Sequence, residues 1–122
     1  MAGKPTTREN SKQVDSPVQE TVAAPVDAID EVIHQKARLG IMSTLMAVGE
    51  ADFKLLKETL GLSDGNLSTH LRMLEENGYV EVRKEFRGRK PHTSAVATAK
   101  GRAAFSAYLE ALEQIIQAAK RF

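Results

Sequence analysis

The chain reads Leu60-Gly61-Leu62-Ser63-Asp64-Gly65-Asn66-Leu67-Ser68-Thr69-His70-Leu71 near its centre. A short helix predicted over residues 54–60 ends at Gly61, because glycine adopts the left-handed conformation that commonly closes a helix. Ser63 is a good N-cap for a second helix, which we expect to run to about Asn77. Two helices joined by so tight a turn predict a helix-turn-helix.

The second of these helices has two contrasting faces. Leu67, Leu71 and Leu74 follow one another at spacings of four and three, so they share a face that we expect to be buried. The opposite face carries small polar side chains and one arginine, namely Asn66, Ser68, Thr69 and Arg72. A helix with such a face can enter the major groove of DNA and present hydrogen-bonding groups to base edges.

The pattern then changes from helical to alternating. Residues 79–86 predict a strand with Val80, Val82 and Phe86 inward, residues 87–91 a turn, and residues 92–97 a return strand. The hairpin holds five basic residues against Glu85, a local net charge of 5 − 1 = +4; they are Arg83, Lys84, Arg87, Arg89 and Lys90. Such a hairpin is called a wing, and its positive charge suits it to contact DNA phosphates or to enter the minor groove. The alternative is a turn that only makes the chain more soluble.

Helices are predicted on both sides of this centre. Asp27 can cap a first helix with a stripe of Ile29, Val32 and Ile33, and a second helix is expected over 36–48. A long last helix, about 98–121, carries an apolar stripe that exceeds what one small core needs. The predicted fold class is therefore mainly α with a small β-hairpin: a winged helix-turn-helix with a long C-terminal dimerisation helix. We expect one domain over 27–122, preceded by a flexible tail over 1–26.

Composition excludes several classes of function. The 122 residues include 17 Lys and Arg against 16 Asp and Glu, a net charge of +1, and no cysteine or tryptophan. That length excludes a two-domain enzyme with a large cleft, and the missing cysteine excludes disulfides and thiolate metal sites. No apolar run approaches a membrane span, and no signal peptide is evident, so a cytoplasmic protein with no membrane partner is expected. No cofactor motif and no metal-ligand spacing is found.

The chain resembles winged-helix transcriptional regulators of the MarR and ArsR type, most of all a compact MarR-like family. The residues that carry the resemblance are Arg38–Met42, Leu60–Leu71, Leu74–Val80, Arg87–Pro91 and Gly101-Arg102. The resemblance implies a homodimer held by the terminal helices, with two recognition helices in successive major grooves of a pseudo-palindromic site. The cysteine metal motifs of ArsR proteins are missing, and the resemblance does not identify a small-molecule effector.

The predicted site residues fall into four groups. Base readout is assigned to Asn66, Ser68, Thr69 and Arg72. Backbone and wing contacts are assigned to Arg83, Lys84, Arg87, Arg89, Lys90 and His92. Further backbone contacts are considered for Arg38, Lys54, Lys57 and Ser63. The dimer interface is assigned to Ile29, Ile33, Phe105, Tyr108, Leu109, Leu112, Ile115, Ile116 and Ala119.

Two side-chain roles have alternatives. Arg38 could equally form an intramolecular salt bridge, and His70 is expected to be a structural histidine rather than a base or phosphate contact. The pair Glu75-Glu76 is expected to face solvent away from DNA.

Two function hypotheses remain. The first is a dimeric, sequence-specific regulator that binds double-stranded DNA and represses by steric block. The second is a winged-helix protein-interaction module, since fold alone does not decide function. The polar outward face and the basic wing favour the first. An enzyme is not expected, because no phosphate-binding loop or nucleophile–base pair is present.

Overall fold

Helices α3 and α4 form the predicted helix-turn-helix. The computed structural model describes residues 26–121, in which α3 ends at Gly61, a left-handed residue with φ of 66°. The Ser63 hydroxyl then accepts a hydrogen bond from the Asn66 backbone N–H at 3.2 Å, which fixes the start of α4. The elements are η2 (Val26–Ala28), α2 (Lys36–Val48), β2 (Glu50–Asp52), α3 (Phe53–Leu60), α4 (Asp64–Glu76), β3 (Val80–Arg87), β4 (Lys90–Ala97) and α5 (Ala99–Lys120).

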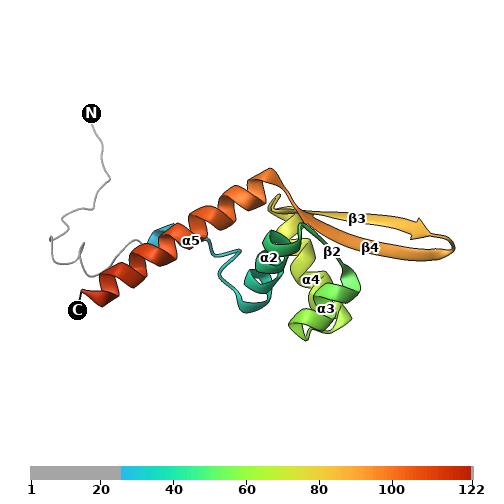
Figure 1. Cartoon of the computed structure of the whole chain (residues 1–122), viewed down its shortest axis with the longest axis horizontal. Coiled ribbons are helices and arrows are strands. Elements are labelled where there is room, and N and C mark those ends of the chain that lie inside the picture. Colours follow the sequence, from blue (N-terminus) through green and yellow to red (C-terminus); the bar gives the residue numbers. More distant parts are fainter. Residues whose placement is uncertain (1–25, 122) are drawn as a thin grey trace, which may run out of the picture.

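The arrangement is that of a winged helix. Helices α2, α3 and α4 pack into one helical body, while the β3–β4 hairpin and α5 project from it in opposite directions (Figure 1). The leucines of α4 are almost completely buried, as are Ile41, Met42 and Leu45 of α2. Each such side chain stabilises the fold by about 1.5–3 kcal/mol. Burial of this face leaves the opposite face of α4 to solvent.

The sheet has three antiparallel strands in the order β2-β4-β3. Strands β3 and β4 pair from Val80↔Ala97 to Arg87↔Lys90, so the connection is only Gly88-Arg89, with Gly88 at φ of 66°. The predicted turn over 87–91 is thus too long. The third strand, β2, pairs with the other edge of β4 and ties the wing to the end of α2.

The prediction that Phe86 faces inward is wrong. Val80 and Val82 lie over the helical body, but Phe86 is 74% exposed. The alternation along β3 does place Phe86 on the same side of the sheet as Val82. The far end of the hairpin extends past the helices (Figure 1), so within residues 26–121 no helix covers this side near the tip, and Phe86 stays exposed.

Helix α5 is anchored by its first turn. The Thr98 hydroxyl accepts a hydrogen bond from the Gly101 N–H at 2.9 Å and donates one to the Gly78 carbonyl at 2.6 Å. A Cβ at Gly101 would lie 2.0 Å from the Tyr79 carbonyl oxygen, so the helix can cross the chain here only with glycine. This crossing directs α5 away from the wing.

The first predicted helix, starting at Asp27, does not form. The structure has only the 3-10 turn η2, followed by a loop in which Asp30 Oδ1 accepts from the N–H groups of Val32 and Ile33 at 2.8 and 3.1 Å. A short acidic side chain that bonds nearby N–H groups competes with helix hydrogen bonds. Asp30 also accepts from the Tyr79 hydroxyl at 2.5 Å, and this bond, ahead of burial, raises the pKa of Tyr79 to about 12.

The predicted dimer residues do not form one exposed surface. Ile33, Phe105 and Tyr108 are buried in the core of a single chain, with 0%, 8% and 1% of their surface exposed, so they cannot serve as a free interface. The N-terminal half of the α5 stripe is therefore core. Ile29, Leu112 and Ile115 are half-buried, whereas Leu109, Ile116 and Ala119 are exposed. The predicted tail lies outside the described residues, except for Val26.

Candidate nucleic-acid interface

The outward face of α4 is exposed in the described chain. Asn66, Ser68, Thr69 and Arg72 are all exposed. Within residues 26–121, none of these side chains takes part in an ion pair or a side-chain hydrogen bond. Their donors and acceptors are therefore available to a ligand, as base readout requires.

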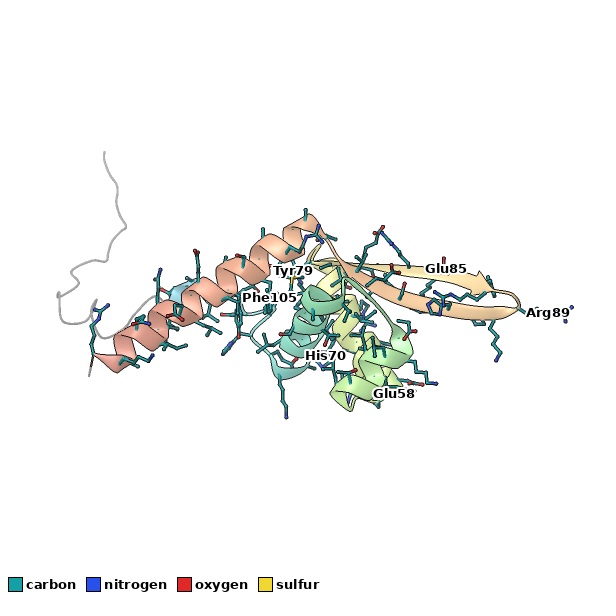
Figure 2. The ribbon with its side chains drawn as sticks, viewed as in Figure 1. Glu58, His70, Tyr79, Glu85, Arg89 and Phe105 are labelled. Atoms are coloured by element: carbon teal, nitrogen blue, oxygen red, sulfur yellow. The ribbon has the colours of Figure 1, made fainter. Side chains whose placement is uncertain are left out.

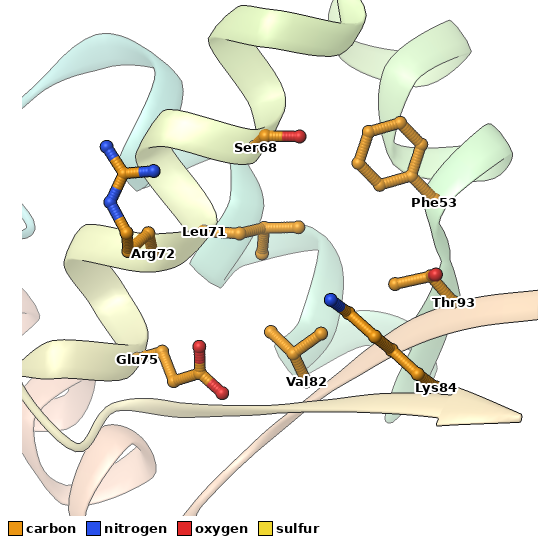
Figure 3. Close-up of a pocket in the computed structure, with 8 residues that line it drawn as sticks. All are labelled: Phe53, Ser68, Leu71, Arg72, Glu75, Val82, Lys84 and Thr93. Carbon is orange, nitrogen blue, oxygen red and sulfur yellow. The ribbon is translucent and has the colours of Figure 1, made fainter.

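A groove separates α4 from the wing. Its inner part has a volume of about 310 Å³ and is lined by Phe53, Ser68, Leu71, Arg72, Glu75, Val82, Lys84 and Thr93 (Figure 3). Lys84 extends into this space from β3, and Arg72 comes from α4 (Figure 3). A neighbouring pocket of about 550 Å³ shares Phe53, Ser68, Lys84 and Thr93 and reaches Lys54 and Pro91. We call the two together the α4–wing groove.

Glu75 is exposed, as expected from the sequence. It also lines the groove, together with Arg72 and Lys84 (Figure 3). Within the described chain it makes no ion pair with either. Sequence periodicity places Glu75 one turn beyond Leu71, and only the position of β3 reveals that this flank of α4 faces the wing.

The basic residues of the wing divide between its two sides. Lys84 and Phe86 lie on the side that faces the groove, opposite Thr93 and Pro91 respectively. Arg83 lies on the other side, where it meets Glu81 at 3.3 Å and Glu50 at 3.6 Å.

Further along the far side, the Arg87 guanidinium lies 3.9 Å from Glu85, and His92 is half-buried opposite Glu85. Figure 2 shows Arg89 at the tip of the hairpin and Glu85 on the side away from α3 and α4. Among the described residues, Lys84, Arg89 and Lys90 form no ion pair. The predicted local charge of +4 is thus partly neutralised on the far side and unpaired at the groove and tip.

Comparison with known proteins agrees with this geometry. Residues 37–116 match the family model described as "Winged helix DNA-binding domain". The chain belongs to this family. It is 36% identical to an uncharacterised protein of Methanocaldococcus jannaschii over 85 residues, which cover 70% of this chain and 92% of that one.

Two solved structures extend the comparison with winged-helix proteins. One is described as a transcriptional regulator homologue from Pyrococcus horikoshii, with a TM-score of 0.68 and 33% identity, over 72% of this chain and 87% of that one. The other is a MarR-family protein of Enterococcus faecalis, with a TM-score of 0.62 and 25% identity, over 92% and 100% of the two chains. The matched residues 37–116 include α4 and the β3–β4 hairpin.

Several residues that were predicted to contact the DNA backbone make internal contacts in this winged helix. The Arg38 guanidinium donates to the Val32 carbonyl at 2.5 Å, to His70 Nδ1 at 3.1 Å and to Met73 Sδ at 3.2 Å. Within residues 26–121 Arg38 forms no salt bridge, and these internal contacts occupy its Nε and one terminal nitrogen, so a phosphate contact by Arg38 stays a prediction. The Ser63 hydroxyl caps α4 by accepting the hydrogen bond from the Asn66 backbone N–H.

The two candidate lysines of α3 differ. Lys57 Nζ pairs with Asp64 at 2.8 Å, and the hydrogen bond, followed by the charge of Asp64, raises the pKa of Lys57. Lys54 is exposed, lines the α4–wing groove and has no ion pair in the described chain. Of the candidate backbone residues, Lys54 is therefore the one whose charge remains open to a phosphate.

His70, on α4, forms a hydrogen bond with Arg38 of α2. Because a guanidinium only donates hydrogen bonds, the unprotonated Nδ1 of His70 must accept from Arg38. Burial, and then the positive charge of Arg38, lower the pKa of His70. This is an internal contact and not a surface for DNA.

Sequence reasoning missed Phe53 and Thr93, which complete the wall of the groove. The alternation along β4 could have identified Thr93, because it lies opposite Lys84. Within residues 26–121, no cluster of three His, Asp or Glu side chains could hold a metal ion, and no helix is long and apolar enough to cross a membrane.

Proposed function

We propose that this winged helix is a sequence-specific, double-stranded-DNA-binding transcriptional regulator that acts as a homodimer. The observation that carries the proposal is the outward face of α4, whose polar side chains are exposed and unbonded next to a groove containing Lys84. An α-helix about 10–12 Å across fits a major groove about 12 Å wide. In this position Arg72 would pair with guanine, while Asn66, Ser68 and Thr69 would contact neighbouring base edges.

The unpaired cations provide the sequence-independent part of the affinity. Lys54, Lys84, Arg89 and Lys90 surround the groove or lie at the wing tip, and phosphate contacts dominate non-specific DNA binding. Arg89, at the tip of the wing, would contact a phosphate at the edge of the minor groove next to the site of α4. Arg83 and Arg87 contribute less, because their acidic partners on the far side compete with phosphate.

A dimer is supported by the distal part of α5. Leu109 and Ile116 are 49% and 45% exposed, and with Leu112 and Ala119 they continue the apolar stripe beyond the core. An apolar stripe of this kind on an exposed helix favours association with a second copy. Two-fold symmetry would place two recognition helices on a pseudo-palindromic site, with half-site centres about 34 Å apart. Repression would follow from steric block of transcription in the cytoplasm.

The test is selection of duplexes from a random library by the full chain. The proposal predicts an enriched motif with two-fold symmetry and half-sites one helical turn apart. An enriched site without that symmetry would contradict the dimer. Absence of any salt-dependent DNA binding at low ionic strength would favour the protein-interaction module instead.

A further inference from the structure

Phe86 is the most exposed large hydrophobic residue in the described chain, at 74%. It pairs across the hairpin with Pro91, which is also exposed. The groove-facing side of the wing therefore runs from buried valine and alanine, through Lys84 and Thr93, to an apolar pair next to the tip. We call Phe86 and Pro91 the apolar pair.

The surroundings of the apolar pair indicate what covers it. Arg89 and Lys90 are next to it at the tip, Lys84 lies two residues before Phe86 on the same side, and all three are exposed without an ion pair in residues 26–121. An apolar protein surface would have to strip water from these cations, whereas a duplex offers both phosphates for them and apolar sugar edges for a phenyl ring. Charge complementarity thus favours DNA over a second protein.

We infer that Phe86 packs against deoxyribose in the minor groove beside the site of α4, with Pro91 as its support. The inference rests on the proposed function and adds an apolar determinant to it. Wing cations would hold phosphates, while the phenyl ring would exclude water from the sugar wall. Proteins that enter the minor groove commonly use apolar side chains there, next to the polar and basic ones that read its width. Phe86 would therefore favour sites whose flanking minor groove has the width that brings sugar and ring into contact.

The experiment compares two variants of the full chain that differ in apolarity at one position. Phe86→Gln removes the apolar group and keeps a side chain of moderate length, whereas Phe86→Leu keeps an apolar one. Because the side chain is exposed, neither should change the fold, which a thermal melt verifies. Affinity for the selected duplex is measured by fluorescence anisotropy at several salt concentrations.

We expect Phe86→Gln to weaken binding about tenfold, equivalent to about 1.4 kcal/mol, and Phe86→Leu to restore most of the loss. The slope of log affinity against log salt should stay unchanged, since no phosphate contact is lost. Hydroxyl-radical footprinting, which reports exposure of sugar hydrogens in the minor groove, should show protection flanking the α4 site in the wild type. Phe86→Gln should lose that protection.

The outcomes separate this inference from the proposed function. If the wild type binds the duplex and Phe86→Gln binds equally well with the same footprint, the inference is wrong, and a protein partner becomes the better occupant. A fall in the salt slope with Phe86→Gln would also overturn it, because the residue would then act through the phosphate contacts. Failure of the wild type to bind any duplex would overturn the proposed function first.

Discussion

Arg72 is the only arginine of the recognition helix, and within the described chain its guanidinium has no acidic partner. An arginine in this position can donate two parallel hydrogen bonds to O6 and N7 of guanine, a pairing that distinguishes guanine from the other bases. Glu75 and Lys84 line the same groove, so they set the electrostatic environment in which Arg72 acts. At the scale of single residues, we therefore propose that Arg72 carries sequence preference and Lys84 carries affinity.

The first prediction concerns Arg72→Ala. Affinity for the selected duplex should fall by about 1–3 kcal/mol, while affinity for a scrambled duplex should change less, because the hydrogen bonds to guanine are lost only in the selected duplex, whereas the loss of one positive charge affects both duplexes. Competition binding with the two duplexes measures the ratio. Arg72→Lys is the matched control: it keeps the charge and should preserve the salt dependence but not the preference. An unchanged ratio in Arg72→Ala would remove Arg72 from base readout.

His70 provides a second prediction, on stability. Its pKa is lowered in the folded state, so the unfolded chain binds the proton more readily and stability is lost as pH falls below about 6.5. Above that pH the contact with Arg38 is fully present. Urea unfolding between pH 5 and 8 should show the loss in the wild type.

His70→Gln is the control for this effect. Glutamine can accept from Arg38 but does not titrate, so the variant should lose less stability than the wild type over the same pH range. Identical pH profiles for the two proteins would show that His70 does not contribute. Carboxylates affect both profiles equally and cancel in the comparison.

At the scale of elements, the sequence predicted correctly those features that hydrogen bonds between nearby residues determine. The bounds of α2 and the cap at Ser63 follow from hydrogen bonds within a few residues, and the structure has them as predicted. The helix predicted to start at Asp27, with its stripe of Ile29, Val32 and Ile33, is wrong. The conformation of this segment depends on Asp30 reaching Tyr79, 49 residues away, and on Arg38 holding the Val32 carbonyl.

The candidate site likewise has a part that could be predicted from the sequence and a part that could not. The outward residues of α4 could be read from helical periodicity alone. The two sides of the wing could not, since the predicted turn was too long and the acidic partner Glu50 lies on β2, a strand joined to β4 only by the fold. Likewise, the apolar stripe of α5 shows which face is apolar, but not that its first half packs on the chain's own core.

Helix α5 yields a third prediction. Ile116→Glu should shift the solution mass from two chains to one, because an unpaired carboxylate in an apolar interface costs on the order of 3 kcal/mol, about a hundredfold in the dimer constant. Light scattering behind size exclusion measures the mass. Gln114→Glu, an exposed position on the opposite face of α5, is the matched control and should stay dimeric. A monomeric wild type, or a dimeric Ile116→Glu protein, would contradict the proposed interface.

At the scale of the whole molecule, the wing and α5 extend in opposite directions from the helical body (Figure 1). One end therefore suits contact with DNA and the other contact with a second copy, and neither would obstruct the other. The net charge of +1 hides this division. Arg83 and Arg87 are matched by acids on the far side of the wing, so the unpaired positive charge lies where a duplex would meet α4.

The most direct test of the account is the salt dependence of DNA binding by the full chain and by Arg89→Ala. Anisotropy titrations would use the selected duplex and a scrambled duplex. Four phosphate contacts per chain, from Lys54, Lys84, Arg89 and Lys90, predict a slope of log affinity against log salt of about −7 for the dimer. Arg89→Ala should reduce that slope by about 2 and weaken both duplexes alike. Binding that is indifferent to salt, or equal affinity of the wild type for the two duplexes, would contradict the account.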